Sequence, residues 1–527
     1  MVDPAAPEAV LPALAVLTPA VTAFALPLAH IAGLGRRGVE ALALLSSIIT
    51  GFFSVKLLAA VLSDGTPLTY CFGGWPPPLG IFYEVDVTGA LLGCLTACLM
   101  FLIVLFSVGY MEDDGRLYLY YTLLMVVEAG MLGCFYTGDF FNLFVMIEVT
   151  AISSYALVSY LRSDRVAVAA SLKYAVYGAL ATTAYFAATV FAYGSMGTLN
   201  MADMHAKIAG IPTPLTGTGF ANVGLGLLVF VALALYAFTY KSALFPNHFW
   251  LPEAHSSAPT PVSALLSGLV VNVGIYAIVR FTYTVIGGAS AVGKYLPIAL
   301  LATGAASAVI GGLLMNLQRD VKRLIAYSTV MNLGFIALGY GLSTDLGVAA
   351  ATYHLVTHAV AKAMLFMSAG LAIACVGSRN LSDLEGVGRA SPFIGFMIGV
   401  STLTLAGVPP LSVFMSEYAL ITAMVRAGNY FALAAFLTAY VSGAVAYLKL
   451  LYVTCVKPPR KPRTEIRGRG ATYSVLTILA VACVALGLLA PLIFRSVFMP
   501  AAHTLMNPSQ YLKAFLHYAS TLTSYSP

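Results

Sequence analysis

Long apolar runs follow one another along almost the whole chain and leave few alternatives for its fold. About 20 consecutive apolar residues cross the hydrocarbon core of a bilayer as an α-helix. Fourteen runs of that order occupy residues 9–33, 39–63, 87–110, 117–137, 140–161, 168–193, 220–243, 261–286, 295–316, 324–342, 346–376, 391–425, 429–455 and 472–495. Charged residues make up only 9% of the sequence, against about 25% in a typical soluble domain. The sequence therefore predicts an all-α integral membrane protein of about fourteen transmembrane helices.

The positive charges in the short loops predict the orientation, because cytoplasmic loops are enriched in Lys and Arg. With the N-terminus outside, sixteen Lys and Arg residues, Lys322 among them, fall in cytoplasmic loops and five in outside segments. This asymmetry predicts that both termini are outside, as are the two longest loops, 64–86 and 194–219. Three consecutive prolines in the first of these loops exclude a helix and predict an ordered loop or a short hairpin.

The sequence contains no motif for a nucleotide or a redox cofactor. There is no GxGxxG, no Walker loop and no haem-attachment motif, and the seven cysteines form no CxxC or Cys/His cluster. Cys94 and Cys98, one helical turn apart in an apolar run, are expected to be packing residues. We therefore expect no cofactor and no metal in this chain, and no nucleic acid as a partner.

Charged residues inside the apolar runs are the first candidates for function, since each costs about 2.5–3.5 kcal/mol near the centre of the bilayer. They are Lys56, Lys173, Lys241, Arg280, Lys362, Lys449, Glu128, Glu148 and Glu417. Lys56, Arg280 and Lys449 lie near helix ends, where long side chains reach the interface, and we expect them to anchor their helices. Glu148 is too far from any loop for its short side chain to do so, which favours a site in an ion pathway over a salt bridge. For Glu128 both interpretations remain open.

Two proline-containing breaks interrupt the seventh and twelfth runs. Lys241 precedes the first break, at Pro246, and Glu417 follows the second, at Pro409 and Pro410. Within a membrane such a break is stable only against protein or a water-filled cavity, where an ionisable group can exchange protons. Because the broken helices are an odd number of helices apart, they run in opposite directions, as in inverted-repeat transporters. The repeats would be helices 4–8 and 9–13.

The eleventh run carries three ionisable residues at intervals of four. His354, His358 and Lys362 therefore share one helical face. A stripe of titratable groups along a membrane helix is typical of a proton relay. A bis-His haem or metal site is the alternative, and for either histidine alone a neutral core residue is another.

Six stretches of sequence carry a resemblance to a known family. They are GGWPPPLGI (73–81), YTGDFFNLFVMIEV (136–149), KSALFPNHFWLPEAHSSAPTPVSAL (241–265), DVKRLIAYSTVMNLGF (320–335), HLVTHAVAKAMLFMSAG (354–370) and GVPPLSVFMSE (407–417). They resemble the antiporter-like subunits shared by complex I, the Mrp-type Na⁺/H⁺ antiporters, and the membrane-bound hydrogenases and sulfur reductases; the first two look most like the Mrp D-type subunit. The resemblance implies a multi-pass protein of a prokaryotic cell membrane, divided into residues 1–110, a first five-helix unit 117–286, a second unit 295–455, and a C-terminal helix and tail 472–527.

The resemblance also implies which residues form the proton pathway. The family's ionisable positions fall on Glu148, Lys241, His354, His358, Lys362 and Glu417. One position departs from the family pattern: many D-type relatives carry a lysine where this chain has Asn272. Water, or His354 and Lys362, would therefore have to link the two halves of the proton pathway. Glu128, Lys173 and Asn272 are additional candidates.

Together these features predict a non-catalytic, proton- or Na⁺/H⁺-translocating subunit of a multi-subunit membrane complex. Glu148 is expected to stabilise Lys241 as a cation. The partners would be other membrane subunits and a redox module carrying iron–sulfur or NiFe centres, because this chain has no redox site of its own. The alternatives are a subunit of a stand-alone Mrp-type Na⁺/H⁺ antiporter and a haem- or quinone-binding oxidoreductase subunit. A purely structural scaffold would leave Glu148, Lys241 and Glu417 unexplained.

Overall fold

Helices make up nearly all of the computed structural model, which describes residues 7–112, 115–161, 164–213, 222–461 and 469–523. The first helices are α1 (Leu11–Ile31), α2 (Arg36–Asp64), α3 (Val87–Tyr110), α4 (Leu117–Tyr136), α5 (Phe140–Val158), α6 (Arg165–Met196), α7 (Met201–Ile208), α8 (Val223–Lys241), α9 (Trp250–Ser257), α10 (Thr260–Leu265) and α11 (Val271–Val279). They are followed by α12 (Tyr295–Leu317), α13 (Val321–Gly341), α14 (Asp345–Val376), α15 (Val387–Ala390), α16 (Pro392–Leu405), α17 (Ser412–Arg426), α18 (Tyr430–Leu451), α19 (Arg469–Leu488), α20 (Ala490–Ile493), α21 (Met499–Met506) and α22 (Ser509–Thr523).

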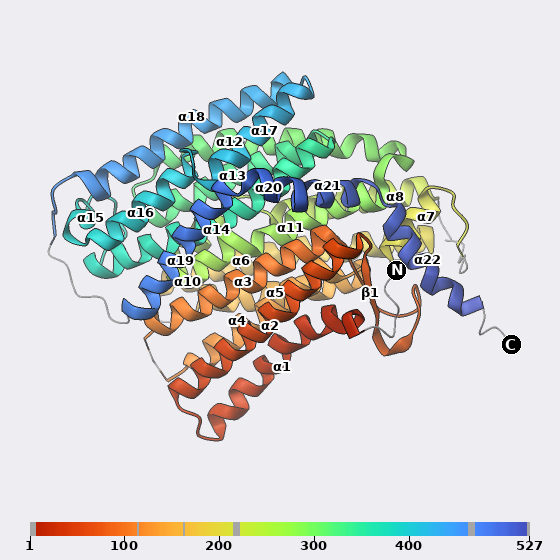
Figure 1. Ribbon diagram of the computed structural model, residues 1–527, viewed down its shortest axis with the longest axis horizontal. Helices are drawn as coiled ribbons and strands as arrows, with labels where there is room; N and C mark the ends of the chain where they lie inside the picture. Colours follow the sequence, from red (N-terminus) through yellow and green to blue (C-terminus); the bar gives the residue numbers. More distant parts are fainter. Residues whose placement is uncertain (1–6, 113–114, 162–163, 214–221, 462–468, 524–527) are drawn as a thin grey trace.

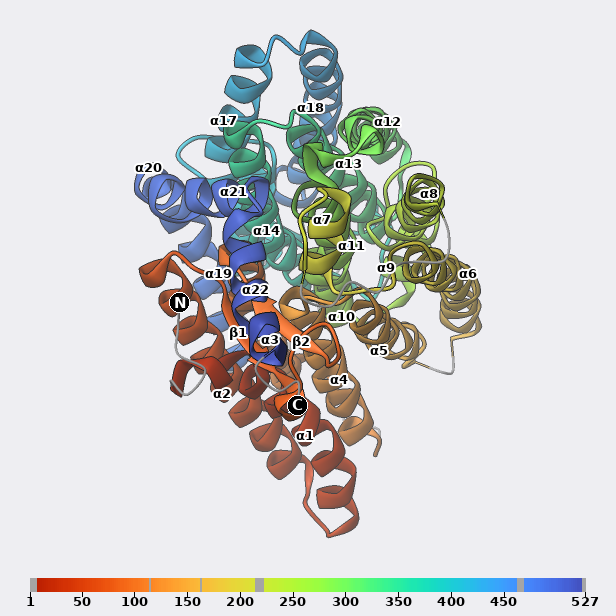
Figure 2. The ribbon, with the colours of Figure 1, turned by 90° about the vertical axis from the view of Figure 1, so that its right-hand side faces the viewer.

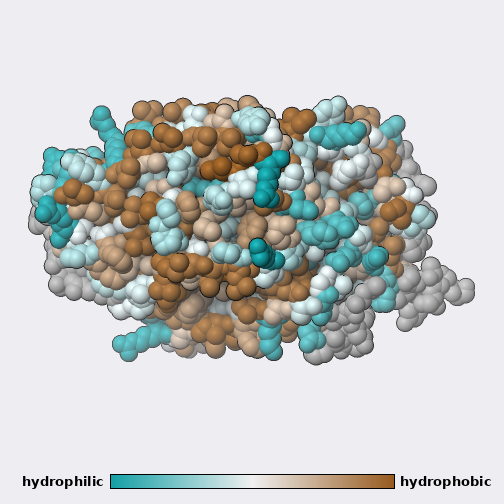
Figure 3. All heavy atoms as spheres, turned by 45° about the horizontal axis from the view of Figure 1, so that its top comes forward, coloured by the Kyte–Doolittle hydropathy of each residue, from teal (hydrophilic) through white to brown (hydrophobic). Residues whose placement is uncertain are grey.

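Thirteen helical segments in the described part of the chain are long and apolar enough to cross a membrane. One of them, 260–286, joins α10 and α11 through the π-helical turn η3 (Leu266–Val270) and continues into η4 (Arg280–Ile286). The remaining run of the fourteen expected is divided into α16 and α17. Figure 3 shows wide areas of apolar side chains on one lateral face, as expected for a surface in contact with lipid. The predicted fold class, an all-α membrane protein, is confirmed.

Aspartate side chains begin several of the spanning helices. Asp86, Asp139, Asp164 and Asp320 precede α3, α5, α6 and α13, and each carboxylate accepts a hydrogen bond from a backbone N–H of the first turn. Such caps satisfy donors that have no partner within the helix. They fix where each helix starts and therefore the depth of every residue along it.

The chain ends and the two longest loops gather at one end of the molecule (Figure 1). The loop after α2 forms a hairpin in which β1 (Leu68–Cys71) pairs antiparallel with β2 (Phe82–Val85), which confirms the hairpin interpretation of this loop. The hairpin, α7 and α22 lie at this end, whereas α15 lies at the other. These three segments, which the loop charges assign to the outside, are thus on the same side of the molecule.

Both breaks contain the prolines identified in the sequence. The chain leaves the helical conformation after Lys241, passes Pro246 and becomes helical again at Trp250. The second break separates α16 from α17 and contains Gly407, whose φ of +67° suits a residue without a side chain, ahead of the two prolines. Whether α4–α11 and α12–α18 form two inverted repeats with the expected boundaries stays a prediction.

Helix α14 occupies the centre of the bundle. Figure 2, which looks along the helices, shows it with α12, α13, α17 and α18 on one side and α1 to α4 on the other. Every residue from Gly347 to Ala372 is buried, although the stretch includes two histidines and a lysine. Because buried polar groups need partners, the contacts of these three residues decide what the bundle can do.

Candidate functional site: a chain of buried polar side chains

The first half of the site joins α5 to the end of α8. Lys241 is the last residue of α8, and its buried amine donates a hydrogen bond to the hydroxyl of Tyr155, at 3.2 Å. Glu148 lies seven residues before Tyr155 and therefore on the same face of α5. It is half-buried and close enough to Lys241 to act on its charge. The structure thus brings together the two residues that the sequence paired.

The contact between them is indirect. In the described part of the chain, Glu148 forms neither an ion pair nor a hydrogen bond, and the amine of Lys241 meets Tyr155 instead. Glu148 therefore acts on Lys241 through space. Tyr155 was not identified from the sequence, although a hydroxyl two turns from Glu148 on the same face was a usable signal.

The second half of the site is a continuous set of hydrogen bonds around α14. The amine of Lys362 donates to the hydroxyls of Ser328 and Tyr447, the latter at 3.4 Å. The amide nitrogen of Asn332 donates to the same Tyr447 hydroxyl at 3.4 Å, and its oxygen lies 3.1 Å from Nε2 of His354. Side chains from α13, α14 and α18 thus connect the lysine to the histidine two turns away.

From His354 the hydrogen bonds continue to α17. Nδ1 of His354 lies 2.9 Å from the hydroxyl of Ser416, the residue before Glu417. Because both ring nitrogens of His354 are already hydrogen-bonded, neither is free for a haem or metal ion, which disfavours the bis-His alternative. Asn332, Ser416 and Tyr447 were not identified from the sequence, since only the folded bundle brings α13, α17 and α18 to α14.

His358 and Glu417 have buried polar atoms without a partner. Both ring nitrogens of His358 and one carboxylate oxygen of Glu417 lack a hydrogen bond in the described part of the chain. The His358 ring lies 6.4 Å from that of His354. The carboxylate of Glu417 lies against Gly407 in the second break, in space that a Cβ would fill. Groups such as these can take a proton or a water molecule.

Asn272 lies between the two halves. Its amide donates to the carbonyl of Gly268 at 2.7 Å, and its oxygen has no partner among the described residues. On one side α11 packs closely at Gly274 on the backbone of Lys241, and on the other Gly268 abuts the backbone of Ala359 in α14. Asn272 therefore lies on a helix that packs on the backbone of Lys241 at one point and on that of α14 at another.

Two further basic or titratable residues extend the site toward the end of the molecule where α15 lies. His255 of α9 is fully buried, its ring nitrogens lack partners in the part of the chain that the structure describes, and it stacks on Phe366, one turn from Lys362. Lys322, expected in a cytoplasmic loop, is instead only 6% exposed and donates to the carbonyl of Ala258 at 2.7 Å. The loop assignment of Lys322 was wrong because α13 starts at the preceding residue and carries the side chain inward.

A cleft of about 500 Å³ opens beside Lys322. Its walls come from the chain after α3, the chain after α5, the end of α9 and its junction with α10, and Arg379. Tyr160, Ser256 and Thr260 contribute polar atoms to it. Lys322 and His255 thus lie between a water-accessible cleft and Lys362.

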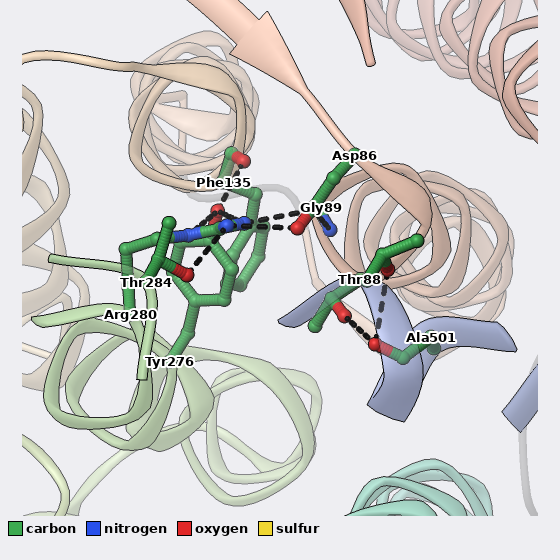
Figure 4. A network of polar contacts seen from close by, with 9 residues as sticks. Asp86, Thr88, Gly89, Phe135, Tyr276, Arg280, Thr284 and Ala501 are labelled. Atoms are coloured by element: carbon green, nitrogen blue, oxygen red, sulfur yellow. Dashed lines mark hydrogen bonds and ion pairs between the residues drawn. The ribbon is translucent and has the colours of Figure 1, made fainter. Parts of the chain in front are cut away.

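Lys173 and Arg280, charged residues within the apolar runs, do not join this chain of contacts. Lys173 is 60% exposed and pairs with Glu253 at 2.9 Å on the surface. Arg280 was expected to anchor its helix, and this expectation was wrong: it is 1% exposed and forms two hydrogen bonds to Asp86, at 2.7 and 2.8 Å. Figure 4 shows the guanidinium between Asp86 and Tyr276. Arg280 is far along the chain from the hairpin, so its partner could not be inferred from sequence.

Known proteins resemble this chain over most of its length. Residues 137–442, more than half of the chain, match the family described as NADH:quinone oxidoreductase/Mrp antiporter, TM. The chain belongs to this family. The D-type subunit of the Na(+)/H(+) antiporter of Alkalihalophilus pseudofirmus is 33% identical over 393 residues, which cover 73% of this chain and 77% of that protein. The N-type subunit of the NADH-quinone oxidoreductase of Desulforudis audaxviator is 29% identical over a match that covers 82% of this chain and 86% of that protein.

Solved structures extend the family likeness to the whole fold. A chain of the membrane-bound sulfane sulfur reductase, an archaeal respiratory membrane complex, superposes with a TM-score of 0.87 at 29% identity, and the match covers 96% of this chain and 99% of that one. A chain of the Mrp complex from Dietzia sp. gives 0.85 at 26% identity, with coverage of 97% and 99%. The predicted family and an antiporter-like membrane subunit are thereby confirmed, and these relatives are subunits of multi-subunit membrane complexes.

Proposed function

We propose that this member of the family moves protons across the membrane along the side chains around α14. The observation that supports this most directly is the set of hydrogen bonds from Lys362 through Tyr447, Asn332 and His354 to Ser416, beside Glu417. The histidine and the hydroxyls of this set can both donate and accept a hydrogen bond. Lys362 and the Asn332 amide both donate to Tyr447, so the proton passes Asn332 by way of a water molecule or a turned side chain. The cleft at Lys322 is the entry and Glu417, at the second break, is the exit.

The Glu148–Lys241 pair supplies the control. A carboxylate near the amine favours the charged lysine, so moving or neutralising Glu148 lowers the affinity of Lys241 for its proton. Glu148 and Lys241 then act as one unit, in which a change at either residue alters the other. Asn272 carries no charge, so the step to α14 passes through water or through the His/Lys stripe.

The energy source lies outside this chain. We infer a complex in which neighbouring membrane subunits and a redox module with iron–sulfur or NiFe centres drive the pump, as the likeness to an archaeal respiratory complex supports. A stand-alone Na⁺/H⁺ antiporter is the second candidate, favoured by the identity to the D-type antiporter subunit. In either assembly the end with the hairpin, α7 and α22 faces the outside, and the ion is H⁺ or Na⁺ exchanged for H⁺.

The experiment is proton transport by the purified complex in liposomes. Lys362→Gln keeps hydrogen-bonding capacity but removes the charge, and we expect transport to fall at least about tenfold, a loss of ~1.4 kcal/mol. Lys449→Gln is the matched control, because Lys449 is exposed and donates to the carbonyl of Asn316. Transport by Lys362→Gln equal to that of the control would refute the pathway. A haem-free absorption spectrum of the complex would count against the haem alternative.

A further inference from the structure

Glu128 faces away from the proton pathway. On α4, Gly130 and Gly133 pack against Thr150 and Met146 of α5, the helix that carries Glu148. At about 100° per residue these glycines lie about 200° and 140° around α4 from Glu128. The carboxylate therefore projects toward the side of α4 opposite α5, where the N-terminal helices pack.

The helices on this side of α4 are α1, α2 and α3, and Cys98 of α3 is near Glu128. The register of α2 against α4 follows from contacts at two depths. Tyr121 of α4 lies close enough to Glu40 for their charges to interact, and the hydroxyl of Tyr136 donates to Ser54 at 3.4 Å. The residue numbers differ by 81 in the first contact and by 82 in the second, so the two helices run parallel in register. Glu128 is therefore level with the middle of α2.

The middle of α2 presents three hydroxyls that have no partner among the described residues. Ser46, Ser47 and Thr50 are buried, and their oxygens lack a hydrogen bond there. Most helical serines and threonines here donate to a carbonyl three or four residues earlier, as Ser107 and Thr150 do. These three do not, so their oxygens remain available to a ligand at the level of Glu128.

The charge at this position is uncompensated. Glu128 is 0% exposed, and both its carboxylate oxygens lack a partner among the described residues. The ionisable groups that act on it or feel its charge are Cys98 of α3 and Tyr136 of α4. Glu40 of α2, at the level of Tyr121, pairs with Arg36 at 2.7 Å. An unpaired carboxylate in a membrane interior is costly, and a single positive charge neutralises it. No second carboxylate in the described surroundings calls for a divalent ion.

We propose that Glu128, Ser47 and Thr50 form a binding site for a monovalent cation of the size of Na⁺. Carboxylate and hydroxyl oxygens are the hard ligands that such ions take. The carboxylate holds either the cation or a proton, so binding of one releases the other. This goes beyond the proposed function, because the site lies on the α2 side of α4 and concerns equilibrium binding rather than transport along α14.

The test is the number of Na⁺ ions bound per purified complex at alkaline pH, measured with ²²Na⁺. Glu128→Gln is expected to lose one Na⁺ per copy of this chain. Glu417→Gln, which neutralises a different buried carboxylate that also has an unpartnered oxygen, is the matched control and is expected to keep it. Ser47→Ala combined with Thr50→Val is expected to raise the Kd for Na⁺ about tenfold while keeping the carboxylate.

Unchanged Na⁺ binding by Glu128→Gln would overturn the proposal. It would also be overturned if Glu128→Gln altered only the protons released by the complex and not the Na⁺ bound, since Glu128 would then be a proton site only. If Glu128→Gln does not assemble, the hydroxyl double variant decides: a raised Kd supports the site and an unchanged Kd refutes it. The two proposals can fail separately. If Lys362→Gln transports protons normally, the proton pathway is refuted, but Na⁺ binding can still depend on Glu128.

Discussion

The lysine at the end of α8 and the lysine within α14 are held in opposite ways. Among the described residues Lys241 has one side-chain hydrogen bond, to Tyr155, and the half-buried carboxylate of Glu148 is nearby. Lys362 donates to two hydroxyls and, at 3.3 Å, to the carbonyl of Ile325, all of them neutral and fixed by packing. A charge that can be moved or protonated sets the proton affinity of the first lysine, whereas fixed dipoles set that of the second. The comparison indicates that the first half controls the proton and the second half conducts it.

The largest expected effect breaks the conducting half at its end. Glu417→Gln removes the carboxylate that lies against the second break, and we expect proton transport to fall at least about tenfold at every pH, ~1.4 kcal/mol or more. Glu417→Lys supplies another group that carries a proton and is expected to restore part of the rate. Both are measured as proton uptake into liposomes containing the assembled complex. Equal loss in the two variants would remove Glu417 from the pathway.

The controlling half is tested by non-additivity. Glu148→Gln and Lys241→Ala are each expected to lower transport about tenfold, because either change removes one member of the electrostatic pair. The double variant is expected to be no worse than about twofold below either single one, since groups that act as one unit do not add. Rates are compared at equal amounts of assembled complex. Losses that multiply would mean that Glu148 and Lys241 act independently.

Two tyrosines sharpen the contrast between the halves. Tyr447→Phe removes the hydroxyl that receives hydrogen bonds from both Lys362 and Asn332, so we expect transport to fall about fivefold, ~1 kcal/mol. Tyr155→Phe leaves the through-space effect of Glu148 in place, and we expect a loss of no more than about twofold. The matched pair is compared in the same liposome assay. A larger loss for Tyr155→Phe would reverse the assignment of control and conduction.

Much of this site could be predicted from the sequence because its charged residues lie in apolar runs, where any charge is conspicuous. Glu148, Lys241, Lys362 and Glu417 were found in this way, and the prolines located both breaks. Thirteen of the fourteen expected spans were also located, in the part of the chain that the structure describes, since length and hydropathy alone define a span.

The neutral partners could not be predicted, because serine, asparagine and tyrosine are common in membrane helices and their roles depend on which helices meet. Tyr447 and Asn332 are separated by 115 residues in sequence and touch only because α13 and α18 both pack near α14. The partner of Arg280 could not be predicted for the same reason. The sequence places Arg280 within an apolar run, but only the folded chain brings Asp86 next to it. The buried position of Lys322 depends on where α13 starts, which hydropathy defines only to within a few residues.

The smallest expected effect concerns the connection between the two halves. Asn272→Lys puts an amine where many D-type relatives carry one, next to the backbone of Gly268, whose carbonyl now accepts from the Asn272 amide. The change removes the side-chain oxygen of Asn272, which is buried and has no hydrogen-bond partner among the described residues. The ammonium group of the new lysine can donate hydrogen bonds to neutral groups around α14. We expect the complex to assemble and to transport within about twofold of the unmodified protein, a difference of ~0.4 kcal/mol, or faster. Asn272→Leu, of similar volume but without polar atoms, is the control and is expected to be slower, because water then has no polar side chain at this point. If Asn272→Lys does not accumulate in the membrane while Asn272→Leu does, a charge is not tolerated between the halves, and the proton passes this point by way of water alone.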